Sequence, residues 1–431
     1  MSPYPIWGEG ESLENHLSLE TMAKLLAGDL SHDELVTEVI PHFLDRCPGC
    51  RRRHGEVRNL QEEVGHWDEK VAVFEGPEAR ELFATLKDLS FDEQLARVLD
   101  DESFQTWGLC QLLLRQSLEA GFEDAARAVN YAELAVKISL HLEDTYDPHW
   151  VLDLRARAQA HLGNARRILG ELRSAEKAFR EAERFLSKSM TGNEIVRADI
   201  LQLKASLRRA QRCFPEALSL VDQALAIFRN HDDFHGFGFS LLKKAKILED
   251  GEDLEGAIAI LKGLLGELDP EREPLLSAYA WHNLVLCLAA AGRYEEAEPL
   301  LPEVRAQLAA QGKALNLVRL RWTEGRIALG LGRTTAAEET FREVQRDFLG
   351  RGMGYDGALV SLDLAILYAR ERRNSELKRL AVEMAPIFES RDVHREALAA
   401  LFMFRQACED ERVTVELATE LAFQLRRHHQ P

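Results

Sequence analysis

Apolar residues recur three and four positions apart through most of the chain from about residue 100 onward. This i, i+3, i+4, i+7 rhythm is typical of amphipathic helices, and no long run alternates apolar and polar residues with the period of two expected of a strand. The sequence also holds only 13 prolines among 431 residues, so few helices need to be interrupted. The pattern therefore predicts an all-α protein.

The helical pattern itself repeats along the chain. The stretch Leu162 to Ala182 contains a Leu-Gly pair, a second glycine, and then Ala175, Phe179 and Ala182 spaced four and three apart. We call the first of these alanines, Ala175, the anchor of its unit. Equivalent anchors follow at positions 217, 257, 297 and 337, at intervals of 42, 40, 40 and 40 residues. Position 377 continues the series, and degenerate copies are expected at 135 and 417. A fixed period of this length predicts stacked units, each of two helices joined by a short turn.

Small residues occupy one position on the first helix of several units, namely Gly163, Ala205, Ala245 and Gly325. A small side chain there lets the second helix approach closely, and the later alanine acts in the same way from the second helix. Two glycine-rich stretches, residues 232–242 and 350–360, are expected to be longer connections between repeats.

The pattern resembles the tetratricopeptide repeat (TPR) in its longer form. The family signature W-x2-L-G … G-x-Y-x2-A-x3-F-x2-A is matched best by residues 162–182 and 281–304, and Tyr368 keeps an aromatic that several copies lack. This resemblance covers most of the chain and implies an α-solenoid whose superhelical groove binds a protein or a peptide.

In that family the first helix of each pair lines the groove, and the resemblance implies a set of groove residues in this chain. They are Arg157, Asn164, Arg167, Arg209, Lys246, Tyr279, His282, Arg319, Trp322 and Arg326. Basic residues recur in the set, and arginine and lysine favour carboxylates. The set predicts a groove for an acidic or carboxylate-ending peptide. The alternative is that these are ordinary solvated charges on helices.

Charge and composition narrow the choice of partner and compartment. Lys and Arg total 54 against 72 Asp and Glu, a net charge of -18. Such a surface repels phosphate backbones and anionic bilayers, which disfavours nucleic acid as the main partner. No window holds the ~20 apolar residues that span a bilayer, and the amino-terminal residues lack the basic start and apolar core of a signal peptide. We therefore expect a cytoplasmic protein without a membrane segment.

Six cysteines are too few for a disulfide scaffold in a chain of this length. Cys110, Cys213, Cys287 and Cys408 stand alone on apolar helical stretches, so we expect them to be reduced packing residues.

The other two cysteines belong to the stretch HFLDRCPGCRRRH, residues 42–54. Pro48 ends the preceding helix, because the residue before a proline avoids helical geometry. The turn that follows allows Cys47 and Cys50 to curl back toward His42. Zinc prefers four nitrogen or sulfur ligands in a tetrahedron, and C-x2-C commonly supplies two of them. The residues alone leave His16 or His54 as the fourth ligand.

Two other interpretations of the C-x2-C pair stay open beside zinc. One is a redox pair, although such a pair begins a helix whereas this one ends a helix. The other is two thiols in an ordinary helix-capping turn.

The same stretch resembles the zinc-binding anti-sigma factor module of bacteria. That family has a histidine at the start of its first helix and H-x3-C-x2-C at the end of its second. The resemblance implies His16, His42, Cys47 and Cys50 as ligands of a structural zinc ion, and a sigma factor as one candidate partner. Four residues separate His42 from Cys47 where the family has three. The chain then divides into a zinc-binding two-helix module (1–58), a helical connector packed on the first repeat (59–100) and a TPR-like superhelical domain (101–431).

No catalytic motif was found among H-E-x-x-H, G-x-S-x-G, Walker A and a strand-to-helix G-x-G-x-x-G, so an enzyme is not expected. The leading hypothesis is a bacterial, non-enzymatic regulator or scaffold for protein interactions. The alternative is a peptide-sensing transcription regulator whose amino-terminal helices bind DNA. Residues 1–60 carry ten acidic and six basic side chains, which is a weak electrostatic footprint for DNA binding.

Overall fold

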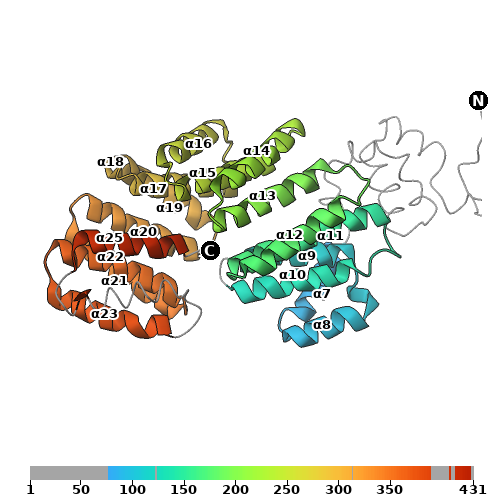
Figure 1. Cartoon of the computed structure of the whole chain (residues 1–431), viewed down its shortest axis with the longest axis horizontal. Coiled ribbons are helices and arrows are strands. Elements are labelled where there is room, and N and C mark those ends of the chain that lie inside the picture. Colours follow the sequence, from blue (N-terminus) through green and yellow to red (C-terminus); the bar gives the residue numbers. More distant parts are fainter. Residues whose placement is uncertain (1–75, 122–123, 313, 390–406, 409–412, 429–431) are drawn as a thin grey trace, which may run out of the picture. The chain divides into compact units, whose positions relative to one another are not determined.

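The computed structural model describes residues 76–121, 124–312, 314–389, 407–408 and 413–428 (Figure 1). Every regular element in these ranges is a helix, which confirms the all-α prediction. The chain forms two compact units, unit 1 up to Gln211 and unit 2 from Arg212, and each is described by itself. No helix of the described ranges combines the length and the apolar character needed to cross a membrane.

Unit 1 contains seven α-helices and one 3-10 helix among its described residues: α7 (Gly76–Leu86), α8 (Phe91–Asp100), η4 (Glu102–Phe104), α9 (Trp107–Ala120), α10 (Ala125–Ser139), α11 (Pro148–Ile168), α12 (Leu172–Leu186) and α13 (Glu194–Ala210). Here α7 packs against α9 and α8 against α10, and α9 to α12 form two successive helix pairs. A capping box starts α8, in which the Ser90 N–H donates to Glu93 Oε2 at 2.9 Å and the Ser90 side chain accepts from the Glu93 N–H.

Unit 2 continues the same architecture with the following described elements: α14 (Phe214–Asn230), α15 (Phe234–Asp250), α16 (Leu254–Glu267), α17 (Pro274–Ala290), α18 (Tyr294–Ala297), η5 (Glu298–Leu300), α19 (Leu301–Ala310), α20 (Ala314–Gly330), α21 (Thr334–Gly350), α22 (Gly354–Arg370), α23 (Asn374–Glu389) and α25 (Val415–His428). Pro299 and Pro302 divide one second helix into α18, η5 and α19, because proline lacks the N–H that a continuous helix needs.

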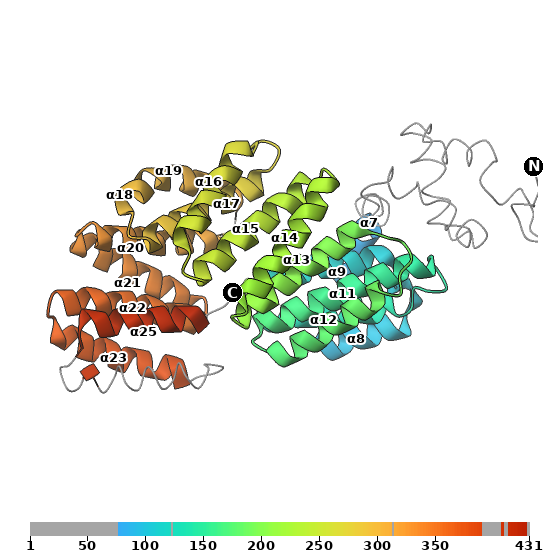
Figure 2. The same cartoon turned by 45° about the horizontal axis from the view of Figure 1, so that its top comes forward.

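The helices of unit 2 form two layers, which Figures 1 and 2 show from two directions. The first helices α15, α17, α20 and α22 contact one another in succession, and each also contacts the second helix of its own pair. This layering confirms the α-solenoid of TPR-like repeats. One layer of first helices therefore runs through the whole unit.

The anchor residues are buried on the second helices. Alanine fills the anchor at positions 175, 217, 257, 297 and 337 with 0 % exposure, and Leu377 is 2 % exposed. In each case the anchor is the fourth residue of its helix. The degenerate copies differ from the expectation: the fourth residues of α10 and α25 are Ala128 and Ala418, both fully buried, in place of positions 135 and 417. The loop between Ser139 and Pro148 lengthens that repeat, so a constant 40-residue step misplaces the anchor.

Glycine on a first helix is matched by phenylalanine on the second. A Cβ atom added at Gly163 would lie 2.8 Å from the ring of Phe179, and one at Gly325 would lie 2.7 Å from the ring of Phe341. Where the second helix carries Leu261, the first helix carries Ala245 in the same buried cluster. The small residues thus serve close helix packing, in agreement with the sequence interpretation.

The two glycine-rich stretches are mostly helical, so their interpretation as longer connections was wrong. Helix α15 begins at Phe234 and α22 at Gly354. A Cβ atom at Gly238 would lie 2.2 Å from Leu276 Cδ2 of α17, which leaves no room for a side chain there. Glycine allows close helix approach at this position, as well as being common in turns.

The turn inside each helix pair has one residue in the left-handed region. These residues are Gly170, Arg212, Glu252, Gly292, Gly332 and Arg372, with φ between 57° and 87°. They are 42 residues apart once and 40 residues apart thereafter. A left-handed residue at this point ends the first helix and redirects the chain into the second.

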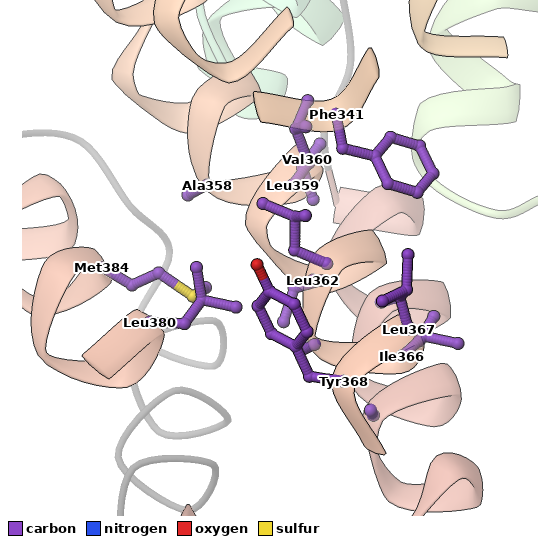
Figure 3. Packing of buried hydrophobic residues seen from close by; sticks show 14 of the residues in the cluster. Phe341, Ala358, Leu359, Val360, Leu362, Ile366, Leu367, Tyr368, Leu380 and Met384 are labelled. Atoms are coloured by element: carbon purple, nitrogen blue, oxygen red, sulfur yellow. The ribbon is translucent and has the colours of Figure 1, made fainter. Parts of the chain in front are cut away.

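Arginines directly after three of these turns bind the preceding repeat. Arg293 Nη1 lies 2.9 Å from Glu255 Oε2, Arg333 pairs with Glu298, and Arg373 Nη1 lies 2.6 Å from Glu338 Oε2. The Tyr368 hydroxyl donates to Glu338 Oε1 at 2.6 Å and joins this network. Figure 3 shows Leu380 and Met384 of α23 facing the Tyr368 ring, which is fully buried.

The cysteine expectation holds in part. Cys110, Cys287 and Cys408 are 2 % exposed or less and pack in apolar clusters. Cys213 is exposed at the start of α14, so it is not a packing residue.

Candidate functional site

The first helices of unit 2 carry a strip of large polar and aromatic side chains. This first-helix strip consists of Phe239 and Lys246 of α15, Tyr279 and His282 of α17, and Arg319, Trp322 and Arg326 of α20. Members recur at intervals of 40 or 80 residues: 239, 279 and 319; 282 and 322; 246 and 326. Consecutive first helices contact each other, so equivalent positions fall beside one another. All members are half-buried except the exposed Lys246.

Arg319 is the least neutralised cation of the strip. The backbone carbonyl of Arg319 accepts a hydrogen bond from the Thr323 hydroxyl at 3.2 Å. The Arg319 guanidinium makes no ion pair with the described residues. Burial lowers the pKa of Arg319, while the charge of Asp356 and the hydroxyl of Tyr279 act in the opposite direction. A partly desolvated guanidinium without a paired carboxylate is a group that an incoming anion stabilises.

His282 is neutral beside this cation. Burial lowers its pKa to about 4, and the charge of Arg319 lowers it further. Its Nε2 atom is buried and has no hydrogen-bond partner among the described residues. At pH 7 the imidazole therefore adds no positive charge and offers one donor or one acceptor at that atom, according to its tautomer.

Trp322 and Lys246 are held by other groups. Trp322 Nε1 donates to Asp363 Oδ2 of α22 at 2.7 Å, and its ring meets Phe348 edge-on at 5.9 Å between centroids. Lys246 Nζ lies 3.0 Å from Glu249 and 3.1 Å from Asp250 on its own helix. A ligand would have to compete with carboxylates at Lys246, whereas at Arg319 it would not.

The strip ends at α22. Every residue from Asp356 to Tyr368 is buried, and the positions equivalent to Arg319, Trp322 and Arg326 are the apolar Leu359, Leu362 and Ile366. Helix α25 packs against α22. Because the side chains of α22 from Asp356 to Tyr368 are all buried, the strip is confined to α15, α17 and α20.

Two candidate residues of unit 1, Asn164 and Arg167, are more deeply buried than the residues of the first-helix strip. Asn164 and Arg167 are both 6 % exposed, and Arg167 Nε and Nη2 donate to Asn164 Oδ1 at 3.2 and 3.1 Å. Burial lowers the pKa of Arg167 to about 9, with the charge of Arg209 as a smaller cause. Arg157 pairs with Asp199 at 3.7 Å, and Arg209 is half-buried. Their assignment to a binding groove stays a prediction.

Sequence reasoning missed three residues that shape this surface: Phe239, Asp356 and Asp363. The signal for the two aspartates was present, because they lie seven residues apart, on one face, in the otherwise apolar helix GYDGALVSLDLAILYAR. A buried carboxylate requires a partner, so each pointed to a polar group on a neighbouring helix. Trp322 is that group for Asp363.

The predicted zinc ligands His16, His42, Cys47 and Cys50, and the alternative His54, lie outside the described residues. Within the ranges that are described, no group of three or more His, Cys, Asp and Glu side chains is arranged to hold a metal ion.

The helix pairs, anchors and turns define the class of this molecule as a TPR-like helical repeat protein. A solved structure of a Rap protein complexed with Competence and Sporulation Factor matches with a TM-score of 0.51 and 14 % identity, covering 74 % of this chain and 93 % of that chain. Aspartyl phosphate phosphatase F from Bacillus subtilis matches with a TM-score of 0.50 and 13 % identity, covering 88 % and 96 %. At these identities the likeness concerns the fold.

A third structure, a putative kinesin light chain of Podosopora anserina with nearly identical TPR-like repeats, has a TM-score of 0.35 and 18 % identity, covering 47 % of this chain and 97 % of that chain. No protein-family model and no curated protein sequence matches the chain.

Proposed function

We propose that the chain is a cytoplasmic regulator or scaffold that binds a protein or peptide partner on the first-helix strip and performs no catalytic step. The observation that carries this proposal is the composition of the strip. Tyr279 and Arg319 occupy equivalent positions, as do His282 and Trp322, and all four are half-buried on one layer. Tyrosine, tryptophan and arginine are the residues that most often dominate binding energy at protein interfaces.

The architecture supports the same proposal. Stacked helix pairs present a continuous layer of first helices, which is the surface that such repeats use for extended partners. One of the solved structures with a similar fold is a Rap protein complexed with Competence and Sporulation Factor. The net charge of -18 makes nucleic acid a poor competitor for this role.

The amino-terminal part of the proposal concerns zinc. His16, His42, Cys47 and Cys50 would hold one structural zinc ion, with His54 as the alternative to His16, and the module would bind a sigma factor or serve as a structural element. Metal analysis of the purified chain beside a Cys47→Ser, Cys50→Ser variant tests this part. One equivalent of zinc in the wild type and its loss in the variant are expected, whereas trace zinc in the wild type would remove the metal from the proposal.

Affinity capture with paired variants tests the binding surface. The tagged full chain is compared with an Arg319→Glu, Arg326→Glu variant and with Lys262→Glu, which reverses an exposed charge on the second helix α16. The partner captured by the wild type should be lost from the strip variant and retained by Lys262→Glu. Equal capture by all three chains would place binding elsewhere and reject the strip.

A further inference from the structure

Helix α12 of unit 1 carries a row of exposed basic side chains, which we call the α12 basic ridge. Arg173, Lys177, Arg180 and Arg184 follow one another at intervals of four, three and four residues, and Lys188 continues the row in the turn after the helix. Because a helix turns by about 100° per residue, the four helical positions fall within an arc of about 60°. They therefore form one narrow face.

The buried face of α12 lies roughly opposite this ridge. Ala175, Phe179 and Ala182 are fully buried, and the Phe179 ring occupies the space beside Gly163 of α11. The ridge thus points away from the core on a second helix of its pair, and it shares no residue with the first-helix strip.

Two carboxylates of α12 are held by cations of the next helix instead of by the ridge. Arg208 of α13 pairs with Glu176, and Lys204 of α13 pairs with Glu183. The hydrogen bond from Arg208 lowers the pKa of Glu176 to about 2, so that carboxylate is ionised and engaged. Both glutamates stand three or four residues from Arg180, the spacing at which opposite charges pair on one helix. Helix α13 therefore removes the natural partners of the ridge.

Four cations of the ridge are left without a partner in the part of the chain that the structure describes. The side chains of Arg173, Lys177, Arg180 and Lys188 make no ion pair or hydrogen bond there, whereas Arg184 is paired on its own helix. Like charges three and four residues apart repel one another. In a chain with a net charge of -18, such a row is a local exception that an anion from outside would stabilise.

An exposed apolar side chain follows the ridge. Met190 is 75 % exposed, although its loop is bound to α11. The Met190 N–H donates to His149 Nδ1 at 3.4 Å, and Thr191 Oγ1 donates to Asp153 Oδ2 at 2.6 Å. A methionine presented to solvent by a hydrogen-bonded loop suits contact with an apolar side chain of a partner, because its unbranched thioether adapts to different shapes.

The spacing of the ridge favours a helical acidic segment as its ligand. On a second helix, acidic residues at i, i+4, i+7 and i+11 recur with the same rise along the axis as the four helical cations, about 6, 4.5 and 6 Å. A nucleic acid fits less well, because its charge continues along the whole duplex and the net charge of -18 repels the part beyond the ridge. A phosphate backbone also offers no apolar group to Met190.

We propose that the α12 basic ridge is a docking surface for an acidic helix of a protein partner, and that Met190 contacts an apolar residue at one end of that helix. This surface is additional to the first-helix strip and does not rest on the proposed function. The partner is recognised through carboxylates along one face of a helix, on the outer layer of unit 1.

Three labelled peptides test the ridge on the full-length chain by fluorescence anisotropy. Each is an alanine-based helix with blocked ends and a leucine at each end. The first carries four glutamates at i, i+4, i+7 and i+11, the second carries glutamines there, and the third spreads the four glutamates around the helix. The first should bind about tenfold more tightly than the second, as a few exposed ion pairs of ordinary strength would give, and also more tightly than the third. Its affinity should fall as salt rises from about 50 to 300 mM.

Variants connect this preference to the ridge. Lys177→Gln, Arg180→Gln should weaken binding of the first peptide about fivefold. The matched control, Arg127→Gln, Lys137→Gln, removes the same charge from exposed positions of the second helix α10 in the same unit and should leave the affinity unchanged. Met190→Ser should weaken binding, and Met190→Leu should retain it. Circular dichroism melting of each variant verifies folding.

Equal or absent binding of the first two peptides by the wild type would overturn the docking surface, and so would equal losses in the ridge variant and the α10 control. Equal binding of the first and third peptides would reject the helical ligand. Tighter binding of a short DNA duplex, lost in the ridge variant, would assign the ridge to nucleic acid and also overturn the proposal. Each of these failures leaves the first-helix strip intact, because Arg319→Glu, Arg326→Glu tests that surface separately.

Discussion

Gly163 has no side chain because the ring of Phe179 occupies the space that a Cβ atom would need. The pair Gly325 and Phe341 repeats this arrangement, whereas Ala245 accompanies Leu261. The size of the residue on the first helix is therefore set by the residue it meets on the second.

Replacing Gly163 tests this matching of sizes. Gly163→Ala should destabilise the chain by about 1–3 kcal/mol, because the methyl group would lie 2.8 Å from the Phe179 ring and force it to move. Urea unfolding of Gly163→Ala, Phe179→Leu and the double variant gives the coupling between the two sites. The double variant should be more stable than the sum of the single effects predicts, and strictly additive effects would contradict the size-matching account.

Asp153 provides a test of burial by pH. It is 5 % exposed on α11, accepts a hydrogen bond from Thr191 Oγ1 at 2.6 Å, and its Oδ1 has no hydrogen-bond partner among the described residues. Burial raises its pKa from 3.8 to about 6, although hydrogen bonds from Thr191 and Ser189 oppose the shift. The folded chain thus holds this proton more tightly than the unfolded chain does.

The sign of the pH dependence follows from that difference. The contribution of Asp153 to stability is fully present below pH 3.8 and is lost as the pH rises through about 6. Relative to the wild type, Asp153→Asn should gain on the order of 1–3 kcal/mol in unfolding free energy between pH 4 and pH 7. Urea midpoints at four pH values across this range measure it. Parallel curves for the two proteins would show that Asp153 does not titrate as described.

At the scale of elements, the turns inside the helix pairs use glycine or a strained residue at one position. Gly292 and Gly332 adopt φ values of 74° and 76°, while Glu252 and Arg372 adopt 71° and 57° with a Cβ atom present. A left-handed conformation costs an L-residue other than glycine roughly 1–2 kcal/mol.

Glu252→Gly should relieve that cost. After allowance for the greater freedom of glycine in the unfolded chain, a net stabilisation of about 0.5–1 kcal/mol is expected. Thermal unfolding of Glu252→Gly beside Glu252→Ala measures the effect, since alanine keeps the Cβ atom and should bring no comparable gain. An equal gain in both variants would point to the lost carboxylate instead of the turn conformation.

The helix pairs could be predicted from the sequence because each anchor is a small or apolar residue at a constant interval. Where the interval changes, the prediction failed: the longer loop before Pro148 moves the first anchor to Ala128. Glycine was the other source of error, since Gly238 serves close packing against Leu276 within a helix and resembles a turn glycine in the sequence alone. Local patterns reveal period and amphipathicity, but they do not show which neighbour a residue meets.

The candidate site was predictable to a similar degree. Tyr279, His282, Arg319 and Trp322 could be placed on first helices from the period, and the structure puts all four on one layer. The pairing of Lys246 was predictable, because Glu249 and Asp250 follow it by three and four residues on the same helix. The bond between Trp322 and Asp363 joins two helices and could not be derived. Pairing depends on side-chain direction in three dimensions.

At the scale of the whole molecule, a chain with a net charge of -18 carries a layer of half-buried aromatic and basic side chains on the first helices of unit 2. The strip is bounded at α22, where the equivalent positions are apolar and buried. A partner bound there would contact α15, α17 and α20. Such a surface favours a short or locally acidic segment over an extensively charged partner.

Site-specific photo-crosslinking in cells of the native host tests the central claim, that the first-helix strip of unit 2 binds a protein or peptide. Benzoylphenylalanine is placed at Tyr279 on the first helix α17 and, as the control, at Lys262 on the neighbouring second helix α16. The account predicts a discrete crosslinked partner at Tyr279, its loss on Arg319→Glu in the same chain, and no such product at Lys262. The same product at both positions, or at Lys262 alone, would contradict it.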